Sequence, residues 1–245
     1  MKITGNVVLI TGATAGIGRE LAERFAALGN KVIACGRRAE RLQELKSKYP
    51  DIVTRQCDIS DPEQRSAIAK WVAVAHPDLN VLINNAGIQL AVDLTRPVEL
   101  EDLRLEIETN LTAPLHLGSL LVGLLAGKPA AAIINISSGL AFSPIAFMPV
   151  YCATKAAVHS YTLSLRHQLR ESTVRVFEIA PPSVDTELGH QRRTDASASH
   201  GGMPVDELVT EVLRAIEGDR FEAAIGPAEN MHRMREELFA RMNGG

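Results

Sequence analysis

The sequence predicts an α/β protein in which helices cover both faces of a parallel sheet, and three observations support this fold class. Short runs rich in Val and Ile alternate with longer amphipathic segments along the whole chain. Polar or glycine-containing loops follow several of these runs directly. The chain has 245 residues, of which 46% are apolar and 22% are charged, a balance that is typical of globular proteins. A large α/β sheet accommodates this length as one domain, residues 1–245.

The short apolar runs predict about seven strands. They contain many β-branched residues and little alternation of apolar with polar residues, as in strands that are buried on both faces of a parallel sheet. The predicted strands lie at residues 7–10, 31–35, 51–57, 79–83, 130–136, 174–179 and 221–225. Because helical segments separate them, the sheet is expected to be doubly wound, with ligands at the carboxyl ends of its strands.

The segments between the strands predict helices. Asp61 and Pro62 are typical of a helix start, since Asp caps the N-terminus and Pro suits the first turn. Asn110 lies inside a long helical stretch, residues 99–127, where we expect it to be exposed or to mark a local bend. Other helices are predicted at residues 19–28, 39–49, 150–171, 205–217 and 228–242. The polar segment 187–204 is expected to be a mobile substrate loop of the same domain.

Charge and apolar patterning favour small-molecule chemistry. The formal net charge of −3 offers no electrostatic basis for binding nucleic acid or an anionic membrane. The N-terminal residues enter a strand-like run without a basic region, a long apolar stretch or a cleavage site, so we expect no export signal and a cytoplasmic protein. The apolar run 111–127 contains Pro114 and His116 and is shorter than a bilayer requires, so it predicts a buried or interfacial helix.

The cysteines and histidines indicate neither a disulfide framework nor a metal site. Cys35, Cys57 and Cys152 form an odd set without CxxC spacing, which predicts reduced and buried thiols. The seven His residues form no HExxH pattern and no Cys/His cluster, so no metal is expected.

A glycine loop with the sequence TGATAGIG, residues 11–18, follows the first strand and leads into an amphipathic segment. A strand, a glycine turn and a helix in this order suit a pyrophosphate, because the turn is tight, the backbone lacks Cβ atoms where the anion approaches, and the helix N-terminus binds anions. The spacing is GxxxGxG, which differs from the more familiar GxGxxG. Simple turn glycines are the alternative interpretation.

The loop after the second strand indicates which dinucleotide binds. In dinucleotide-binding folds an acidic residue at this place binds the ribose 2′-hydroxyl of NAD, whereas an Arg binds the 2′-phosphate of NADP. This chain has Gly36 followed by Arg37 and Arg38, and guanidinium groups pair well with phosphate. NADP(H) is therefore favoured over NAD(H). Alternatively, the two arginines begin a solvated helix in which Glu40 and Glu44 pair with them.

Two further strand ends carry residues suited to a ligand. Asp58 follows the third strand and has two interpretations, contact with an adenine amino group or capping of the next helix. The fourth strand leads into Asn84-Asn85-Ala86-Gly87, where small and amide residues let a ligand lie close to the backbone.

Tyr151 and Lys155 lie four residues apart on a predicted helix and therefore share one face. A free Tyr has a pKa of about 10, so lowering it to 7 requires about 4 kcal/mol. A cation at about 5 Å, with an effective dielectric constant of about 20, supplies about 3 kcal/mol, and a second positive charge such as an oxidised nicotinamide would complete the shift. Tyr151 is thus a candidate general acid or base. A surface contact without chemistry is the alternative.

Taken together in this order, the motifs resemble the compact branch of the short-chain dehydrogenase/reductase family over nearly the whole chain. Residues 11–18 look like its TGxxxGxG loop and residues 84–87 are its NNAG. The resemblance implies a Rossmann-type fold of three layers and a catalytic set of Asn110, Ser138, Tyr151 and Lys155. Ser138, thirteen residues before Tyr151, fits the family spacing better than its neighbour Ser137.

The same resemblance implies the cofactor-binding residues. Asp58 stands where the family has its adenine-contacting Asp, and Thr186 matches the Thr that meets the nicotinamide carboxamide. The whole implied set is Gly12, Thr14, Ala15, Gly16, Ile17, Gly18, Arg37, Arg38, Asp58, Ile59, Asn85, Ala86, Gly87, Tyr151, Lys155, Pro181, Val184 and Thr186. One departure is Pro182, where the family usually has Gly, which makes the backbone beside the nicotinamide stiffer.

Segments 151–157, 163–170 and 180–186 are also similar to the DltE-like oxidoreductase subgroup, a label that names no substrate. The resemblance implies an NADP(H)-dependent enzyme that acts on a small carbonyl or alcohol, and a homodimer or homotetramer paired through the helices near 99–127 and 150–171. Two other functions compete. A dinucleotide-binding sensor or scaffold would be free to lose Tyr151 or Lys155, and a methyltransferase on a related sheet leaves that pair unexplained.

Overall fold

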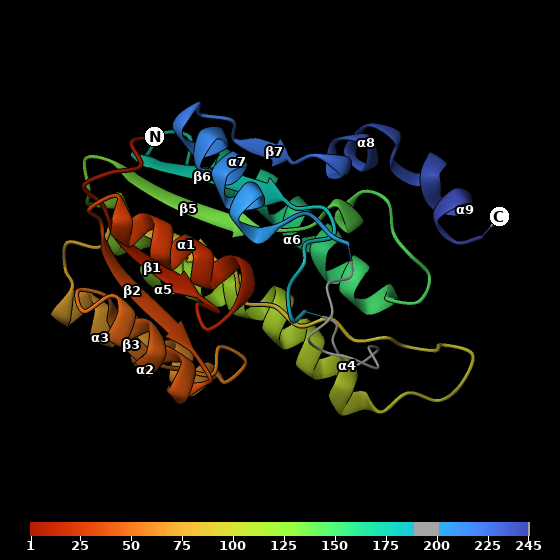
Figure 1. Cartoon of the computed structure of the whole chain (residues 1–245), viewed down its shortest axis with the longest axis horizontal. Coiled ribbons are helices and arrows are strands. Elements are labelled where there is room, and N and C mark those ends of the chain that lie inside the picture. The colour runs from red at the N-terminus through yellow and green to blue at the C-terminus, as the bar shows by residue number, and fades with distance from the viewer. Residues whose placement is uncertain (189–200, 245) are drawn as a thin grey trace.

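Seven parallel strands run through the centre of the molecule in the order β3-β2-β1-β4-β5-β6-β7, in a computed structural model that describes residues 1–188 and 201–244 (Figure 1). Every neighbouring pair is parallel. The strands are β1 Val7–Thr11, β2 Lys31–Gly36, β3 Val53–Gln56, β4 Val81–Asn84, β5 Ala131–Ile136, β6 Val174–Ala180 and β7 Glu222–Ala224. The predicted doubly wound sheet of seven strands is confirmed. Most of the predicted substrate loop, 187–204, lies outside the described residues.

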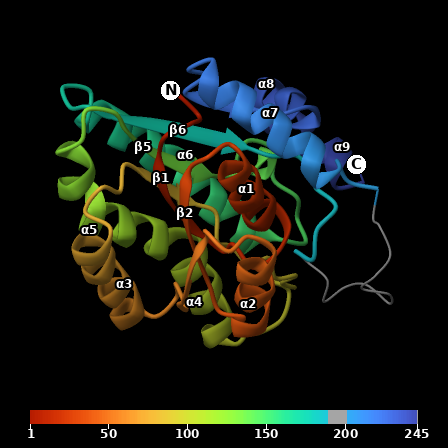
Figure 2. The same cartoon turned by 60° about the vertical axis from the view of Figure 1, so that its left-hand side comes forward.

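Helices cover both faces of the sheet and complete three layers (Figure 2). Successive side chains of a strand point to opposite faces, so Val8 and Ile10 pack into one hydrophobic cluster whereas Leu9 packs into the other. The first cluster includes buried residues of α1 Gly16–Ala27, α2 Ala39–Lys48 and α7 Val205–Glu217. The second includes buried residues of α3 Pro62–Ala75 and α5 Ala113–Ala126. Two buried faces explain why the strands carry nearly continuous apolar runs.

The long stretch that was predicted as one helix is divided. A π-helical turn, η1 Glu108–Thr112, separates α4 Leu100–Ile107 from α5. Asn110 lies in this turn with only 2% of its surface exposed, so the expected local irregularity is present and solvent exposure is not. By length and composition alone, Leu100–Ala126 is the one described stretch able to cross a bilayer. Leu117, Leu121 and Leu125 of this stretch instead pack against the sheet.

The carboxyl ends of the strands bring their loops together. The backbone N–H of Ser137, after β5, donates to the carbonyl of Ile179 in β6, and Gly139 N–H donates to the carbonyl of Pro181. Helix α6, Pro149–Gln168, follows this region and carries Tyr151 near its start. The Rossmann-type topology therefore places the loops that follow the strands at one edge of the sheet.

The C-terminal segment crosses the chain that follows β5. The single predicted helix 228–242 is broken into α8 Pro227–Met234, a 3₁₀ turn η4 Arg235–Leu238 and α9 Phe239–Met242. The break coincides with Arg235, whose φ is 49°. Ser143 Oγ lies 3.0 Å from the Met231 carbonyl and 2.7 Å from the Arg235 carbonyl, so the segment is held to the loop near the active-site candidates.

Candidate active site

The glycine loop is a packing junction between three loops. Gly12 and Gly16 have φ values of +69° and +52°, which favour glycine. A Cβ on Gly12 would lie 2.8 Å from Ala86 Cα, and one on Gly16 would lie 3.0 Å from Thr186 Cγ2. A Cβ on Gly18 would lie 2.3 Å from Asn85 Nδ2. The glycines at these positions make room for the neighbouring loops, and their role in bringing the backbone close to a pyrophosphate stays a prediction.

The start of α1 still suits an anion. Its N-cap residue, Ala15, makes no side-chain cap, and the first turn contains no acidic residue. The free N–H groups and the positive end of the helix dipole therefore face no negative side chain from this turn. Thr14 precedes them and is buried, while Ile17 in the first turn packs against the core. These residues fit a dinucleotide phosphate.

The two predicted arginines have different surroundings. Arg38 donates to Thr14 Oγ1 through Nε and Nη2, at 3.2 and 3.0 Å, and its Nη1 lies 2.6 Å from Glu187 Oε2. Arg41 binds the other oxygen of Glu187 at 2.7 Å. The Arg37 side chain is exposed and makes no hydrogen bond with a described residue. Only its backbone carbonyl accepts one, from Gln56 Nε2. Neither arginine pairs with Glu40 or Glu44 within the described chain. The alternative in which these glutamates are the partners of the two arginines is therefore wrong.

Arg37 lines a recess of about 290 Å³ with Gln56, Asp58 and Gln64, at the carboxyl ends of β2 and β3. One oxygen of Asp58 accepts hydrogen bonds from the Ser60 N–H and Ser60 Oγ, at 2.9 and 2.7 Å. The N-cap of α3 is Asp61, so Asp58 does not cap this helix. Ile59, the next residue after Asp58, is buried. A cationic group and a carboxylate at one recess fit an adenosine whose ribose carries a phosphate.

Tyr151, Ser138 and Lys155 are brought together by α6 and the end of β5. The hydroxyl of Ser138 lies beside the phenol of Tyr151, whose pKa it lowers, and its Oγ accepts from Leu140 N–H at 3.1 Å. Lys155 Nζ lies 5.6 Å from the Tyr151 ring centroid and donates to the carbonyl of Ile136 at 2.9 Å. All three side chains are at most 8% exposed. The arrangement therefore brings a phenol, a hydroxyl and an ammonium group together in one buried place.

Ser137 points elsewhere. Its Oγ donates to Glu178 Oε1 at 2.6 Å. The two serines therefore have separate partners, as expected for neighbours in extended chain. This supports the choice of Ser138 by spacing.

Asn110 joins the loop after β4 to this group. Its Oδ1 accepts from Ile88 N–H and its Nδ2 donates to the Ile88 carbonyl, both at 2.8 Å. A Cβ on Gly87 would lie 3.3 Å from Asn110 Oδ1 and 3.7 Å from Lys155 Nζ. The π-helical turn thus aims the amide at the backbone beside Lys155, in line with the frequent occurrence of such turns at functional sites.

Other implied cofactor residues surround the same edge. Asn85 Nδ2 donates to the Thr11 carbonyl at 2.9 Å, and its own N–H donates to Thr11 Oγ1 at 3.0 Å. Val184 forms a parallel bridge with Met203. Pro181 accepts the Gly139 N–H through its carbonyl at 2.8 Å, and Pro182 follows it. The two prolines leave this contact between β5 and β6 intact.

The electrostatics of the pair differ from the sequence-based expectation. Burial raises the pKa of Tyr151, and the nearby Ser138 hydroxyl opposes this shift only in part. Burial also lowers the pKa of Lys155 to about 8, against the negative charges of Glu178 and Glu106. From the sequence we expected the positive charge of Lys155, together with a second cation, to lower the pKa of Tyr151 toward 7. That argument omitted desolvation, which disfavours both the phenolate and the ammonium in this buried setting.

Two buried glutamates near Lys155 were not predicted. Glu106, in α4, is fully buried: its Oε1 accepts from Leu90 N–H at 3.0 Å, its Oε2 has no hydrogen-bond partner, and burial raises its pKa. Glu178, in β6, is also fully buried. In the sequence, only the position of Glu178 as a charged residue within an apolar strand could have indicated its role. Glu106 lies in a helix, where a Glu is ordinary, and nothing in the sequence indicated its burial.

Comparisons with known proteins show which family the chain resembles. A model of the short chain dehydrogenase family matches residues 6–197. The uncharacterized oxidoreductase DltE of Bacillus subtilis strain 168 is 46% identical over 250 residues, which cover 99% of this chain and 98% of DltE. A short chain dehydrogenase from Burkholderia cenocepacia, solved with NADP, is 30% identical, with 99% of both chains covered and a TM-score of 0.85. One from Burkholderia phymatum, solved with NAD, covers 100% of this chain and 97% of its own, with 24% identity and a TM-score of 0.87, and shows the fold alone.

The glycine junction leads to a stability prediction. Gly18→Ala forces a Cβ to within 2.5 Å of the Gly12 carbonyl oxygen, so we expect the free energy of unfolding to fall by about 1–3 kcal/mol. The control is Gly123→Ala in α5, where nothing lies within 4 Å, and which should be neutral or stabilising by up to about 1 kcal/mol. Urea unfolding followed by circular dichroism measures both. Equal stability of Gly18→Ala and wild type would contradict the packing role.

Proposed function

Because the chain belongs to the short-chain dehydrogenase/reductase family, in its DltE-like branch, we propose that it is an NADP(H)-dependent oxidoreductase that transfers hydride between nicotinamide and a carbonyl or alcohol substrate. The observation that carries the proposal is the meeting of Ser138, Tyr151 and Lys155 at the carboxyl edge of the sheet. Asn110 and the glycine loop lie at the same edge. The nicotinamide, when bound, supplies the hydride chemistry, and the protein positions and polarises the substrate.

In this proposal Tyr151 moves the proton. Its raised pKa keeps the phenol protonated at neutral pH, so the Oη hydrogen is available to an alkoxide that develops from a carbonyl. Ser138, which already contacts the phenol, would donate to the same substrate oxygen and hold the carbonyl in line. In alcohol oxidation the same two groups act in the reverse direction.

Lys155 would stabilise the phenolate that remains after proton donation. The ammonium is charged below its pKa of about 8 and loses this charge as the pH rises further. Its reach toward the ribose hydroxyls of a cofactor is consistent with its place beside Gly87. Asn110 holds Ile88 and the π-helical turn in position, and we propose that it also orders a water that links Lys155 to solvent.

Dinucleotide choice is proposed from Arg37 and Arg38. Arg37 faces the recess with an unengaged guanidinium among the described residues, which suits a 2′-phosphate. Arg38 is shared between Thr14 and Glu187 and would have to exchange a carboxylate partner for the phosphate. We therefore propose NADP(H), with Arg37 as the principal 2′-phosphate contact.

A dinucleotide-binding sensor or scaffold is the competing function. It would use the same glycine loop and recess without needing the Ser138, Tyr151 and Lys155 arrangement. The close contact of these three side chains favours turnover, because a protein that only binds has no use for a buried acid beside a buried cation.

The first prediction concerns the proton donor. Tyr151→Phe removes the only proposed acid while retaining the ring, so carbonyl reduction should fall by about 10²- to 10⁴-fold with little change in NADPH binding. Wild type and variant are compared spectrophotometrically on a panel of carbonyl compounds, with NADPH binding followed by fluorescence. Full turnover by Tyr151→Phe would overturn the assignment. Tight NADPH binding by wild type, without oxidation on the whole panel, would favour the sensor.

The second prediction concerns the arginines. Charged hydrogen bonds contribute about 1.5–3 kcal/mol, so Arg37→Ala should weaken NADPH binding by about 10- to 100-fold and leave NADH binding unchanged. Arg38→Ala should have a smaller effect, because Glu187 already engages that side chain. Dissociation constants for both nicotinamides measure the preference. If it is unchanged in both variants, neither arginine selects the cofactor.

The third prediction concerns self-association through α5 and α6. Leu120 and Leu163 are 41% and 43% exposed on these helices, so they offer apolar surface for the pairing that the family resemblance implies. We propose a homodimer or homotetramer. Light scattering should show wild type above the monomer mass and Leu163→Arg closer to it. Val74→Arg is the matched control, since Val74 is 83% exposed on α3 and should not change the mass.

A further inference from the structure

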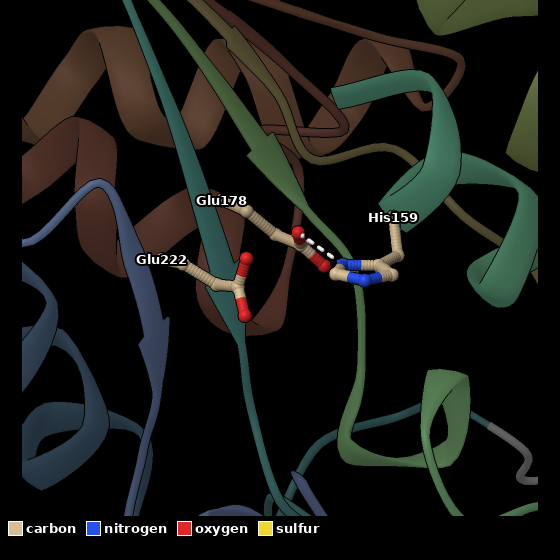
Figure 3. Close-up of side chains that lie close together, drawn as sticks. All are labelled: His159, Glu178 and Glu222. Atoms are coloured by element: carbon tan, nitrogen blue, oxygen red, sulfur yellow. Dashed lines mark hydrogen bonds and ion pairs between the residues drawn. The ribbon is translucent and has the colours of Figure 1, made fainter. Parts of the chain in front are cut away.

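A buried carboxylate lies directly behind the proposed active site. Glu178, in the middle of β6, is fully buried. Its Oε1 accepts from Ser137 Oγ at 2.6 Å, and its Oε2 lies 2.7 Å from His159 Nδ1, as Figure 3 shows for the His159 pair. His159 stands one helical turn after Lys155 in α6. A buried carboxylate is costly without such partners, so this pairing is a built feature of the fold.

The neighbouring strand carries a second pair. Glu222 is opposite Glu178 in the parallel register and lies 2.7 Å from His232 Nε2. The ring of Phe142 packs edge-on against both imidazoles, with centroids 4.9 and 4.6 Å away. Donor atoms of His159, Glu178 and Glu222 lie within 4.8 Å of one another, a metal-like grouping that sequence spacing did not reveal. Each carboxylate already has its own imidazole, so hydrogen bonding accounts for the cluster without a cation.

Lys155 and Glu178 form hydrogen bonds with two consecutive residues at the end of β5. Lys155 Nζ donates to the carbonyl of Ile136, and the next residue, Ser137, donates its hydroxyl to Glu178. The residue after that is Ser138, which contacts the phenol of Tyr151. The loss of the Glu178 carboxylate would therefore act on Tyr151 through the short segment 136–138.

We propose that Glu178 is a positioning residue: its carboxylate, held by Ser137 and His159, orients the end of β5 and places a negative charge beside the strand end that Lys155 contacts. This inference rests on the proposed function for its effect on turnover. Its structural part, the stabilisation of the Lys155 ammonium, stands without it.

The charges around Lys155 support this role. Burial lowers the pKa of Lys155 to about 8, and Glu178 is the largest opposing influence, followed by Glu106. Glu106 has a raised pKa and an oxygen without a hydrogen-bond partner, which makes it the weaker source of negative charge. The other ionisable groups near this face are Tyr151 and Cys152 on α6, with His159, Glu222 and His232 on the Glu178 side.

The test compares Glu178→Gln with Glu222→Gln, a matched loss of charge on the adjacent strand. Lysine labelled with ¹³C at the ε-carbon is titrated by NMR, and Lys155→Met identifies the Lys155 signal. In Glu178→Gln the protonation constant of Lys155 should fall by at least about tenfold, so the ammonium is lost at lower pH. Glu222→Gln should leave it unchanged. Glu178→Asp, which retains the charge, should restore most of it.

Turnover gives the second readout. The wild-type rate should decline as the pH rises through about 8, and this decline should begin about one pH unit lower in Glu178→Gln but not in Glu222→Gln. A Lys155 midpoint that is the same in wild type and folded Glu178→Gln overturns the proposal. So does an equal shift in Glu222→Gln. If wild type reduces no carbonyl, the proposed function fails, and the NMR titration still decides the role of Glu178.

Discussion

The hydrogen bond from Lys155 Nζ to the Ile136 carbonyl is the interaction on which the site depends. It fastens helix α6 to the end of strand β5 and therefore sets the position of Tyr151 relative to Ser138. The bond forms where water is excluded, which strengthens it and makes the ammonium expensive to bury. The charges near this bond therefore influence the pKa of the Lys155 ammonium. The lowered pKa of Lys155 and the two buried glutamates belong to the same electrostatic problem.

Loop packing at the carboxyl edge is the second constraint. Parallel strands must return by crossovers, so their following loops gather at one edge and compete for space. Glycines at positions 12, 16 and 18 relieve this crowding, because each would otherwise place a Cβ against Asn85, Ala86 or Thr186. The motif therefore has a packing role in addition to the phosphate-binding role that we propose for it.

Much of this was predictable from local pattern. Strand positions followed from β-branched runs, and β1, β2, β5 and β6 lie within one residue of the predicted limits. The helix 205–217 was predicted at its observed bounds. Predictions were less accurate where tertiary contacts override local preference. At the π-helical turn the Asn110 amide binds Ile88, and Ser143 contacts the C-terminal segment at its break near Arg235.

The sequence by itself determined the fold class, the family and the residues that are candidates for hydride transfer chemistry, because these depend on periodicity and on motifs with fixed spacing. Only the tertiary structure decided how those residues are surrounded. It buried Tyr151 and Lys155, separated the roles of Arg37 and Arg38, and brought Glu178 to Ser137 from 41 residues away in the chain. Desolvation and long-range charge depend on which atoms exclude water from a group, and the spacing of residues along a chain carries no record of that.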